Sequence, residues 1–350
     1  MTNIHIGNTE IGGSNPCFII AELSANHGKD INIAIETIRA AKKTGADAIK
    51  LQTFTPDTIT LDAKNETFLI NHGTQWDGKY LHELYTETHL PWEWHERLFE
   101  VAKEEGLVCF SSPFDLTAVD FLESLNTPAY KIASPEILDI PLIEKCAKTG
   151  KPIIISTGIA TIADIDLAIQ TCRNVGNNNI VLLKCTTSYP APIEDANLET
   201  MNNFAETFQV IPGLSDHTLG TIVPTVSVAL GAKVIEKHFI LDKSVGGADA
   251  AFSLDVEEFT QMVKSVRDAE KAIGKVSYNI GSKATNLSKL ASRSLFITKD
   301  VKKGETLTKE NIRSIRPGNG LHPKHYKEIL GKKFSKDASF ATPLDFSYIK

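Results

Sequence analysis

Eight short apolar segments rich in β-branched residues recur along residues 1–275, and longer segments with helical periodicity separate them. The eight strand segments begin at residues 17, 47, 107, 129, 152, 180, 210 and 234. This number of strand–helix units, in about 260 residues, matches a (β/α)8 TIM barrel. A doubly wound open sheet is the alternative, but it usually has fewer strands, and no GxGxxG sequence follows the first strand here. The pattern therefore predicts an α/β protein built on a barrel.

Local signals refine this prediction at the first two units. Asp30 is a suitable N-cap for the helix after the first strand, and Gly45 is a suitable stop. A long insertion, from Pro56 to Trp94, separates the second strand from its helix. A segment of that length in a βα loop is typical of an active-site lid or a binding loop.

The strand–helix rhythm ends near Gly274. A polar stretch at residues 276–291 predicts a linker, and residues 292–350 have the short strands and turns of a small, mostly β domain. A domain of about 60 residues is marginally stable alone. We therefore expect it to pack on the barrel (residues 1–275) or on a partner subunit.

Composition indicates the partners and the cellular location that the protein can have. The net charge of -6 gives no overall basis for binding nucleic acid. Met1 precedes no basic and apolar leader, and no apolar run approaches the length of a membrane span, so we expect neither a signal peptide nor a membrane anchor. An odd number of cysteines without a CxxC pair indicates reduced, buried thiols and a cytoplasmic location. The cysteines are Cys17, Cys109, Cys146, Cys172 and Cys185.

Polar residues gather at the ends of the predicted strands, where barrels of this kind carry their chemistry. Lys50 and Lys131 stand inside apolar strands, in "DAIKLQ" and "AYKIAS". Burying a lysine is costly without an anion, so the pair favours a site for a phosphate or carboxylate. Structural salt bridges to Glu22 or Glu136 are the alternative.

Two histidines end neighbouring predicted strands, His217 in "GLSDHTLG" and His238 in "IEKHF". Neighbouring strands lie about 4.8 Å apart, so the two imidazoles can share a divalent cation. Mn²⁺ or Zn²⁺ suits such ligands, and Mg²⁺ less well. The alternative is a turn-capping His217 and a hydrogen-bonded core His238. A Ser-Asp-His triad is disfavoured, because adjacent residues on one strand do not converge; Asp216 is expected to point away and to be structural.

Motifs in the order of the chain resemble the sialic acid synthases, which condense phosphoenolpyruvate with an N-acetylated sugar. They are "AELSANH", "IKLQTF", "SSPFD", "KIASPE", "STGIAT", "CTTSYP", "GLSDHTLG" and "IEKHF". The tail "FITKDVKKGETLTKENIRSIRPGNGL" resembles the antifreeze-like SAF domain of that family. The insertion and "GGADAAFSLD" are more similar to the pseudaminic acid branch. The resemblance thus implies a metal-dependent transferase that uses a 2,4-diacetamido-2,4,6-trideoxy-altrose acceptor. It would release phosphate by breaking the C–O bond between carbon 2 of phosphoenolpyruvate and the phosphate group. N-acetylneuraminate or legionaminate synthesis is the alternative, and a non-catalytic carbohydrate-binding protein is disfavoured by the intact lysines and histidines.

The resemblance also implies roles for individual residues. The catalytic residues are predicted to be Glu22, Lys50, Lys131, Glu136 and Asp249, of which Glu22 and Asp249 bind or ionise acceptor hydroxyls. Substrate is predicted to contact Gln52, Ser134, Ser156, Thr187, Tyr189, Ser215 and Arg316. Thr187 stands where relatives carry asparagine, so no direct amide contact is carried over. His217 and His238 are implied to hold the metal, Mn²⁺ first and Mg²⁺ or Co²⁺ as alternatives. The implied assembly is a domain-swapped homodimer, in which Arg316 of one subunit reaches over the acceptor in the barrel of the other.

Overall fold

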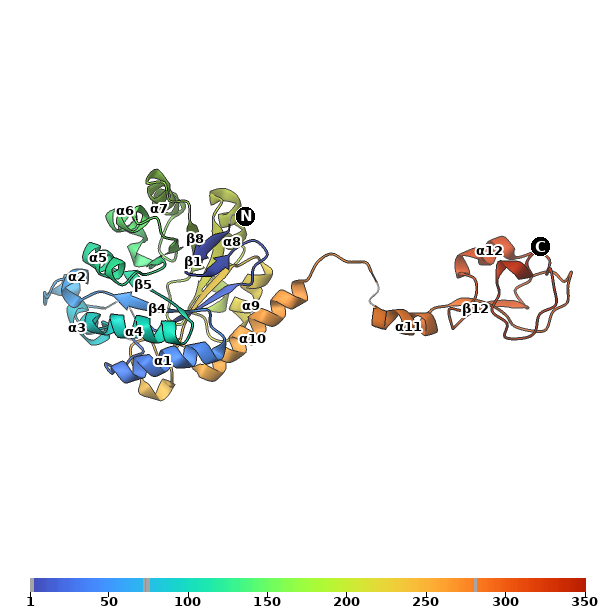
Figure 1. The fold of residues 1–350 in the computed structure, drawn as a ribbon, viewed down its shortest axis with the longest axis horizontal. Helices are drawn as coiled ribbons and strands as arrows, with labels where there is room; N and C mark the ends of the chain where they lie inside the picture. Colours follow the sequence, from blue (N-terminus) through green and yellow to red (C-terminus); the bar gives the residue numbers. More distant parts are fainter. Residues whose placement is uncertain (1–2, 72, 74–75, 280–281) are drawn as a thin grey trace. The chain divides into compact units, whose positions relative to one another are not determined.

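The computed structural model describes residues 3–71, 73, 76–279 and 282–350. Two compact units, residues 1–274 and 275–350, make up the chain. In the first unit eight parallel strands close into a barrel in the order β10-β3-β4-β5-β6-β7-β8-β9 (Figure 1). The strands are β3 (Phe18–Glu22), β4 (Ala48–Thr53), β5 (Val108–Pro113), β6 (Tyr130–Ile132), β7 (Ile153–Ser156), β8 (Ile180–Cys185), β9 (Ile211–Asp216) and β10 (Val234–His238). The predicted (β/α)8 barrel is confirmed.

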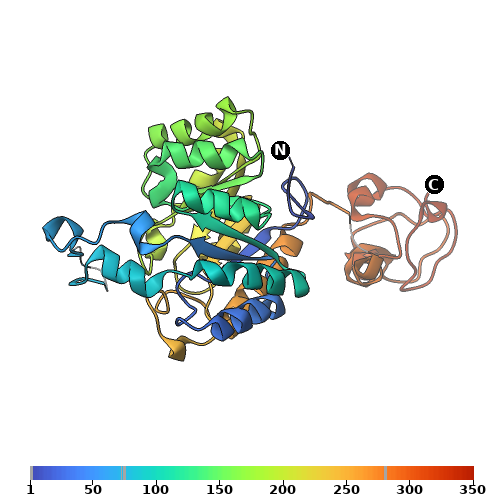
Figure 2. The ribbon, with the colours of Figure 1, turned by 60° about the vertical axis from the view of Figure 1, so that its left-hand side comes forward.

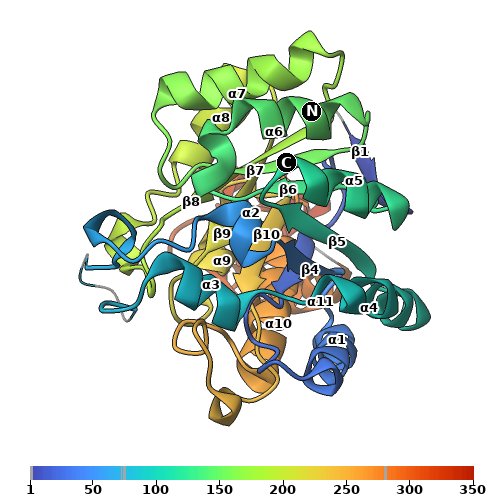
Figure 3. The same cartoon turned by 90° about the vertical axis from the view of Figure 1, so that its left-hand side faces the viewer.

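Helices surround the strands, as the view in Figure 3 shows. They are α1 (Ile31–Thr44), α4 (Trp92–Glu104), α5 (Leu116–Ser124), α6 (Ile140–Lys148), α7 (Ile162–Asn174), α8 (Thr200–Phe208), α9 (Ile222–Ala229) and α10 (Val256–Ile273). At α1 the Asp30 carboxylate accepts from the backbone N–H of Asn32 at 2.8 Å, and Gly45 ends the helix with φ 89°. Asp30 and Gly45 therefore cap this helix as predicted.

A short hairpin, β1 (Ile4–Ile6) and β2 (Thr9–Ile11), precedes the barrel. Its Ile4, Ile6 and Ile11 are buried in one cluster with the side chains that fill the barrel interior, among them Phe18 and Phe110. The same cluster contains Phe18, Ala48 and Val234, the first residues of β3, β4 and β10, so the hairpin closes the N-terminal end of the barrel. The C-terminal strand ends are left to form the functional face.

The insertion after β4 has its own local structure. It contains α2 (Pro56–Ile59), a 3₁₀ turn at Glu66–Phe68, and α3 (Leu81–Thr88). In Figure 2 this blue-to-cyan segment projects from one side of the barrel. Helix α4 begins at Trp92, so its first turn lies inside the stretch predicted as insertion. Smaller 3₁₀ turns follow other strands, at Pro135–Leu138, Ile193–Asp195 and Lys243–Val245.

The second unit has a small core of its own. Strands β11 (Ser294–Ile297) and β12 (Ile312–Ile315) pair antiparallel, and α12 (Tyr326–Ile329) lies between turns at Pro323–His325 and Phe346–Tyr348. Eight buried side chains form the core: Leu295, Ile297, Val301, Leu307, Ile312, Ile329, Phe334 and Leu344. Helix α11 (Ser282–Ala291) spans most of the stretch that we predicted to be a linker. That stretch is polar, but from 282 to 291 it has no glycine or proline to oppose a helix.

All five cysteines are free and buried. Among the described helices, none combines the length and apolar character that a membrane crossing requires.

Candidate active site

A cavity of about 570 Å³ lies at the C-terminal ends of the barrel strands. Residues of the β4–α4 insertion, such as Leu81 and Tyr85, line it together with the strand ends. All the predicted site residues except Arg316 line this cavity. They are Glu22, Lys50, Gln52, Lys131, Ser134, Glu136, Ser156, Thr187, Tyr189, Ser215, His217, His238 and Asp249.

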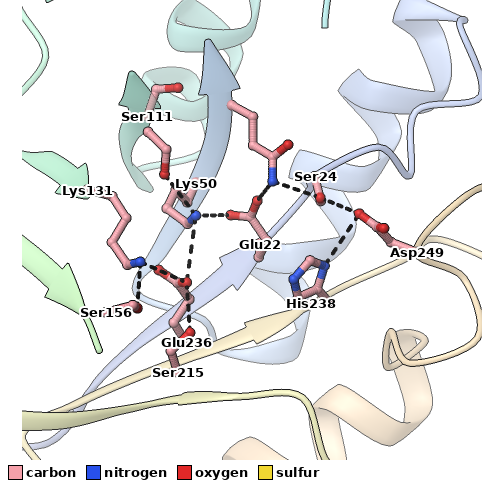
Figure 4. Close-up of polar contacts among 12 residues, drawn as sticks. Glu22, Ser24, Lys50, Ser111, Lys131, Ser156, Ser215, Glu236, His238 and Asp249 are labelled. Atoms are coloured by element: carbon pink, nitrogen blue, oxygen red, sulfur yellow. Dashed lines mark hydrogen bonds and ion pairs between the residues drawn. The ribbon is translucent and has the colours of Figure 1, made fainter. Parts of the chain in front are cut away.

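The two strand lysines meet carboxylates at the bottom of the cavity (Figure 4). Lys50 Nζ lies 2.9 Å from Glu22 Oε2. Lys50 Nζ and Lys131 Nζ each lie 3.6 Å from the same oxygen, Glu236 Oε1. Lys50 is 3% exposed and Lys131 1%, so their charges need these partners. The salt bridge to Glu22 that we weighed as an alternative is present, whereas no ion pair joins Glu136 to either lysine in the described part of the chain.

Hydroxyl groups surround the two ammonium groups. Lys131 Nζ donates to Ser156 Oγ at 2.7 Å, and Lys50 Nζ donates to Ser112 Oγ at 3.1 Å. Ser215 Oγ donates to Glu236 Oε1 at 3.3 Å. Ammonium and hydroxyl donors pointing at one space are suited to the oxygens of a phosphate or carboxylate. Such an anion would bind the lysines beside Glu22 and Glu236.

Burial and charge set the protonation of this cluster. Burial raises the pKa of Glu22 to about 7, although Lys50 beside it acts in the opposite direction. Burial also acts to raise the pKa of Glu236, but Lys131 and Lys50 outweigh it and hold that pKa below its ordinary value. Burial lowers the pKa of Lys131, whereas Glu22 and Glu236 overcome burial at Lys50 and raise its pKa. Glu22 is therefore the carboxyl of this pair able to exchange a proton near neutral pH.

Glu136 is a second carboxyl of this kind. It lies in the turn after β6, and burial raises its pKa to about 7. Its Oε2 atom is buried and has no hydrogen-bond partner among the described residues. A ligand hydroxyl or amide in the cavity can supply that partner.

The histidine pair occupies the neighbouring ends of β9 and β10. The ring centroids of His217 and His238 are 5.3 Å apart. His217 Nδ1 lies 2.9 Å from the carbonyl oxygen of Thr186, so in the neutral ring Nδ1–H donates to that oxygen and the lone pair is on Nε2. Burial holds the pKa of His238 well below its ordinary value, and the charge of the nearby Lys50 acts in the same direction, so this ring is neutral.

These histidines fit a divalent metal ion as two of its ligands. His238 Nδ1 is buried without a hydrogen-bond partner, and Asp249 Oδ2 lies 3.8 Å from it, beyond hydrogen-bonding distance. Within the described ranges, no group of three or more His, Cys, Asp or Glu is arranged to hold a metal. An ion held here would therefore complete its shell with water or substrate oxygens.

Ser24 links the acidic residues of the site, and the sequence did not single it out. Its hydroxyl donates to Asp249 Oδ2 and accepts from Gln52 Nε2 at 2.9 Å. Gln52 Nε2 also donates to Glu22 Oε1 at 3.0 Å. The chain of hydrogen bonds from Glu22 to Asp249 holds the second carboxylate beside His238. Ser24 has φ 48°, a left-handed conformation uncommon outside glycine.

The remaining predicted contacts are Thr187, Tyr189 and Arg316. Thr187 Oγ1 donates to Ser134 Oγ at 3.1 Å. The Tyr189 ring lies 4.5 Å from the His217 ring and 5.0 Å from Phe252, between centroids. Arg316 is exposed in the second unit. Its place over the acceptor remains a proposal.

Strand register explains why Asp216 and Glu236 behave differently. The β9–β10 pairing sets Ser215 beside Glu236 and Asp216 beside Lys237. Successive side chains of a strand point to opposite faces. Ser215 and Glu236 therefore face the cavity, while Asp216 and Lys237 form a buried ion pair on the other face. The expectation that Asp216 points away is confirmed. Glu236 was given no role, although it lies two residues from His238 on one face.

The chain matches models of two protein families. Residues 37–278 match the NeuB family, and residues 292–345 match the SAF domain. The chain belongs to the NeuB family. The resemblance to sialic acid synthases drawn from the sequence motifs is thereby confirmed.

Several NeuB-family relatives align with nearly the whole chain. The pseudaminic acid synthase of Helicobacter pylori is 51% identical over 94% of this chain and 96% of its own length. That of Campylobacter jejuni (serotype O:23/36) is 49% identical over 93% and 95%. The N,N'-diacetyllegionaminic acid synthase of Legionella pneumophila is 38% identical over 97% and 96%. The solved N-acetylneuraminic acid synthetase of Leptospira borgpetersenii, in complex with citrate, superposes with a TM-score of 0.72, at 29% identity over 82% of this chain and 95% of that chain.

Proposed function

We propose that this NeuB-family enzyme condenses phosphoenolpyruvate with 2,4-diacetamido-2,4,6-trideoxy-altrose and water, giving pseudaminic acid and phosphate. The buried pair of Lys50 and Lys131, with hydroxyls around both ammonium groups, carries this proposal. The greater similarity to pseudaminic acid synthases than to the legionaminic acid synthase supports the choice of acceptor.

Phosphoenolpyruvate fits the deep end of the cavity. Its phosphate and carboxylate carry the charges that Lys50 and Lys131 need, and Ser156, Ser215 and Ser134 offer hydroxyls to the same oxygens. Gln52 and Thr187 lie beside them on the cavity wall. In this arrangement the lysines stabilise charge that develops on the phosphoenolpyruvate during the reaction.

The proposed chemistry has three steps. Carbon 3 of phosphoenolpyruvate attacks the aldehyde carbon of the open-chain sugar, so a C–C bond forms and carbon 2 becomes oxocarbenium-like. Water adds to carbon 2, and the tetrahedral intermediate then expels phosphate by cleavage of the C–O bond. Glu22, with a pKa raised to about 7 by burial, is suited to exchange a proton with the water or with an acceptor hydroxyl. Asp249 and Glu136 are positioned to bind acceptor groups, and Tyr189 covers the histidine side of the cavity.

His217 and His238 would hold the metal, for which we propose Mn²⁺, with Mg²⁺ or Co²⁺ as alternatives. When bound, such an ion polarises the acceptor aldehyde as a Lewis acid. The hydrogen bond from Ser24 keeps Asp249 within 3.8 Å of His238. Asp249 can thereby orient the acceptor next to the two histidines.

The assembly that we propose is a homodimer in which the SAF unit of each subunit covers the barrel of the other. Residues 275–350 carry 16 Lys and Arg against 6 Asp and Glu, whereas residues 1–274 carry 21 against 37. Opposite net charges of this size favour association of one unit with the other. Arg316 would then reach the acetamido group of the acceptor.

The free, buried thiols support a cytoplasmic location for the reaction.

The deciding experiment follows phosphate release from phosphoenolpyruvate with a panel of acceptors. The diacetamido trideoxy altrose should give the highest kcat/KM, above its manno-configured isomer and N-acetylmannosamine. A preference for either of the other two would assign legionaminate or N-acetylneuraminate synthesis instead. Phosphoenolpyruvate labelled with ¹⁸O in the bridging position should yield labelled phosphate, and unlabelled phosphate would contradict C–O cleavage.

A further inference from the structure

Three aromatic residues form an apolar wall in the cavity, here called the mouth cluster: Phe54, Tyr85 and Phe114. Phe54 directly follows β4, Phe114 directly follows β5, and Tyr85 comes from α3 of the insertion. The Phe54 ring packs edge-on against Tyr85 at 5.7 Å and against Phe114 at 5.2 Å, between centroids. All three line the same cavity as the two lysines. The roles proposed above leave this wall unused.

The mouth cluster lies across the barrel from the histidines. In the closed ring of eight strands, β5 stands opposite β9, and β4 is the neighbour of β5. His217 directly follows β9. A ligand whose reacting carbon sits beside the histidine pair therefore extends toward Phe114 and Phe54 when it crosses the mouth.

The chemistry of this wall differs from that of the rest of the cavity. Lys50, Lys131, Glu22 and Glu236 form one polar cluster with hydroxyls around it, whereas Ile59, Leu69 and Leu81 are further apolar side chains that the insertion adds to the lining. A sugar hydroxyl pressed against such a wall loses its water without gaining a hydrogen bond, which is unfavourable. A methyl group loses nothing there and buries apolar surface.

We propose that the mouth cluster is a subsite for the C6 methyl group of the acceptor, and that Phe114 and Phe54 determine specificity for 6-deoxy over 6-hydroxy sugars. This inference rests on the proposed function, which supplies a six-carbon acceptor with its aldehyde at the histidines. Tyr85 supports Phe54 from the insertion, so the insertion contributes to substrate choice as well as covering the site.

The test uses two acceptors that differ only at C6: the diacetamido trideoxy altrose and its 6-hydroxy counterpart. Phe114→Leu and Phe114→Asn remove the ring equally and leave side chains of similar shape, one apolar and one polar. Wild-type enzyme should favour the 6-deoxy acceptor by about 10–200-fold in kcat/KM. Phe114→Leu should keep most of this ratio, and Phe114→Asn should lower it at least about tenfold. The ratio does not depend on the fraction of folded enzyme.

The control is Phe121→Leu, which alters an aromatic residue that stacks on Trp92 at 4.7 Å and does not line the cavity. It should leave the ratio unchanged. Equal ratios for Phe114→Leu and Phe114→Asn would overturn the inference and leave the cluster only the task of packing the insertion. If Phe114→Asn turns over too slowly, the dissociation constants of the two acceptors provide the same comparison. A wild-type enzyme that uses neither acceptor would instead refute the proposed function.

Discussion

Glu22 Oε2 lies 2.9 Å from Lys50 Nζ, and both side chains are almost completely buried. An anion that binds Lys50 brings a further negative charge next to the Glu22 carboxyl. Nearby negative charge raises the pKa of a carboxyl group. Anion binding and protonation of Glu22 are therefore coupled at the proposed site.

This coupling predicts that phosphoenolpyruvate binding takes up a proton at pH 8. Free Glu22 has a pKa of about 7, so it is mostly ionised at pH 8, and the bound anion shifts it toward the protonated form. Calorimetry in buffers of different ionisation enthalpy measures the uptake, which should approach one proton. Glu22→Gln should bind phosphoenolpyruvate without this uptake. An unchanged uptake in that variant would place the proton on another group.

Lys131→Met should raise the KM for phosphoenolpyruvate by about 100-fold, because a buried charge partner of the anion is lost. Lys184→Met is the matched control. Lys184 is a partly buried lysine of β8, but its ammonium group donates to Cys185 O and Thr186 Oγ1, and the residue does not line the cavity. Steady-state kinetics should show a raised KM for phosphoenolpyruvate in Lys131→Met and an unchanged KM in Lys184→Met. Similar changes in both would indicate a general effect on the barrel.

Removal of metal should abolish activity, and added Mn²⁺ should restore it. The same ion should bind the wild-type protein in a calorimetric titration without any substrate. The double variant with His217→Ala and His238→Ala should lose this binding, while His325→Ala, altered in the second unit, should keep it. Retained binding in the double variant would exclude the histidine pair as the metal site.

The buried ion pair of Asp216 and Lys237 should matter for stability rather than for chemistry. Lys237 is 0% exposed, so Lys237→Met leaves an unpaired buried carboxylate and should lower the free energy of unfolding by about 3–5 kcal/mol. Lys271→Met removes an exposed pair with Asp268 and should cost less than about 1 kcal/mol. Urea denaturation of both variants measures the difference. An equal decrease in the free energy of unfolding in both variants would contradict a structural role for Asp216.

The part of the fold that produces a periodic pattern of apolar residues was predictable from the sequence. All eight barrel strands coincide with apolar runs, because parallel strands covered by helices are buried on both faces. The β1–β2 hairpin was not predicted. Its strands are three residues each, and their burial depends on an interior that only the closed barrel provides.

The part of the site that lies at the C-terminal ends of the barrel strands was predictable from the sequence. Lys50, Lys131, His217 and His238 were found because charged or imidazole side chains interrupt apolar runs at positions that a barrel brings together. Glu236 was given no role, although the two-residue period places it on the face of His238. The mouth cluster was not predicted, because Phe54 and Phe114 have the same local pattern as core residues and Tyr85 arrives from a long insertion.

The hairpin that fills the N-terminal end of the barrel has a kinetic consequence. With that end packed by Ile4, Ile6 and Ile11, the cavity is reached from the strand-end side. Phosphoenolpyruvate, which we place deepest, must then arrive before the sugar, because a sugar already in the mouth blocks its path. Phosphate released beside the lysines must likewise wait for the sugar acid to depart. With phosphoenolpyruvate and the sugar placed as proposed, we therefore expect a compulsory order of arrival and departure.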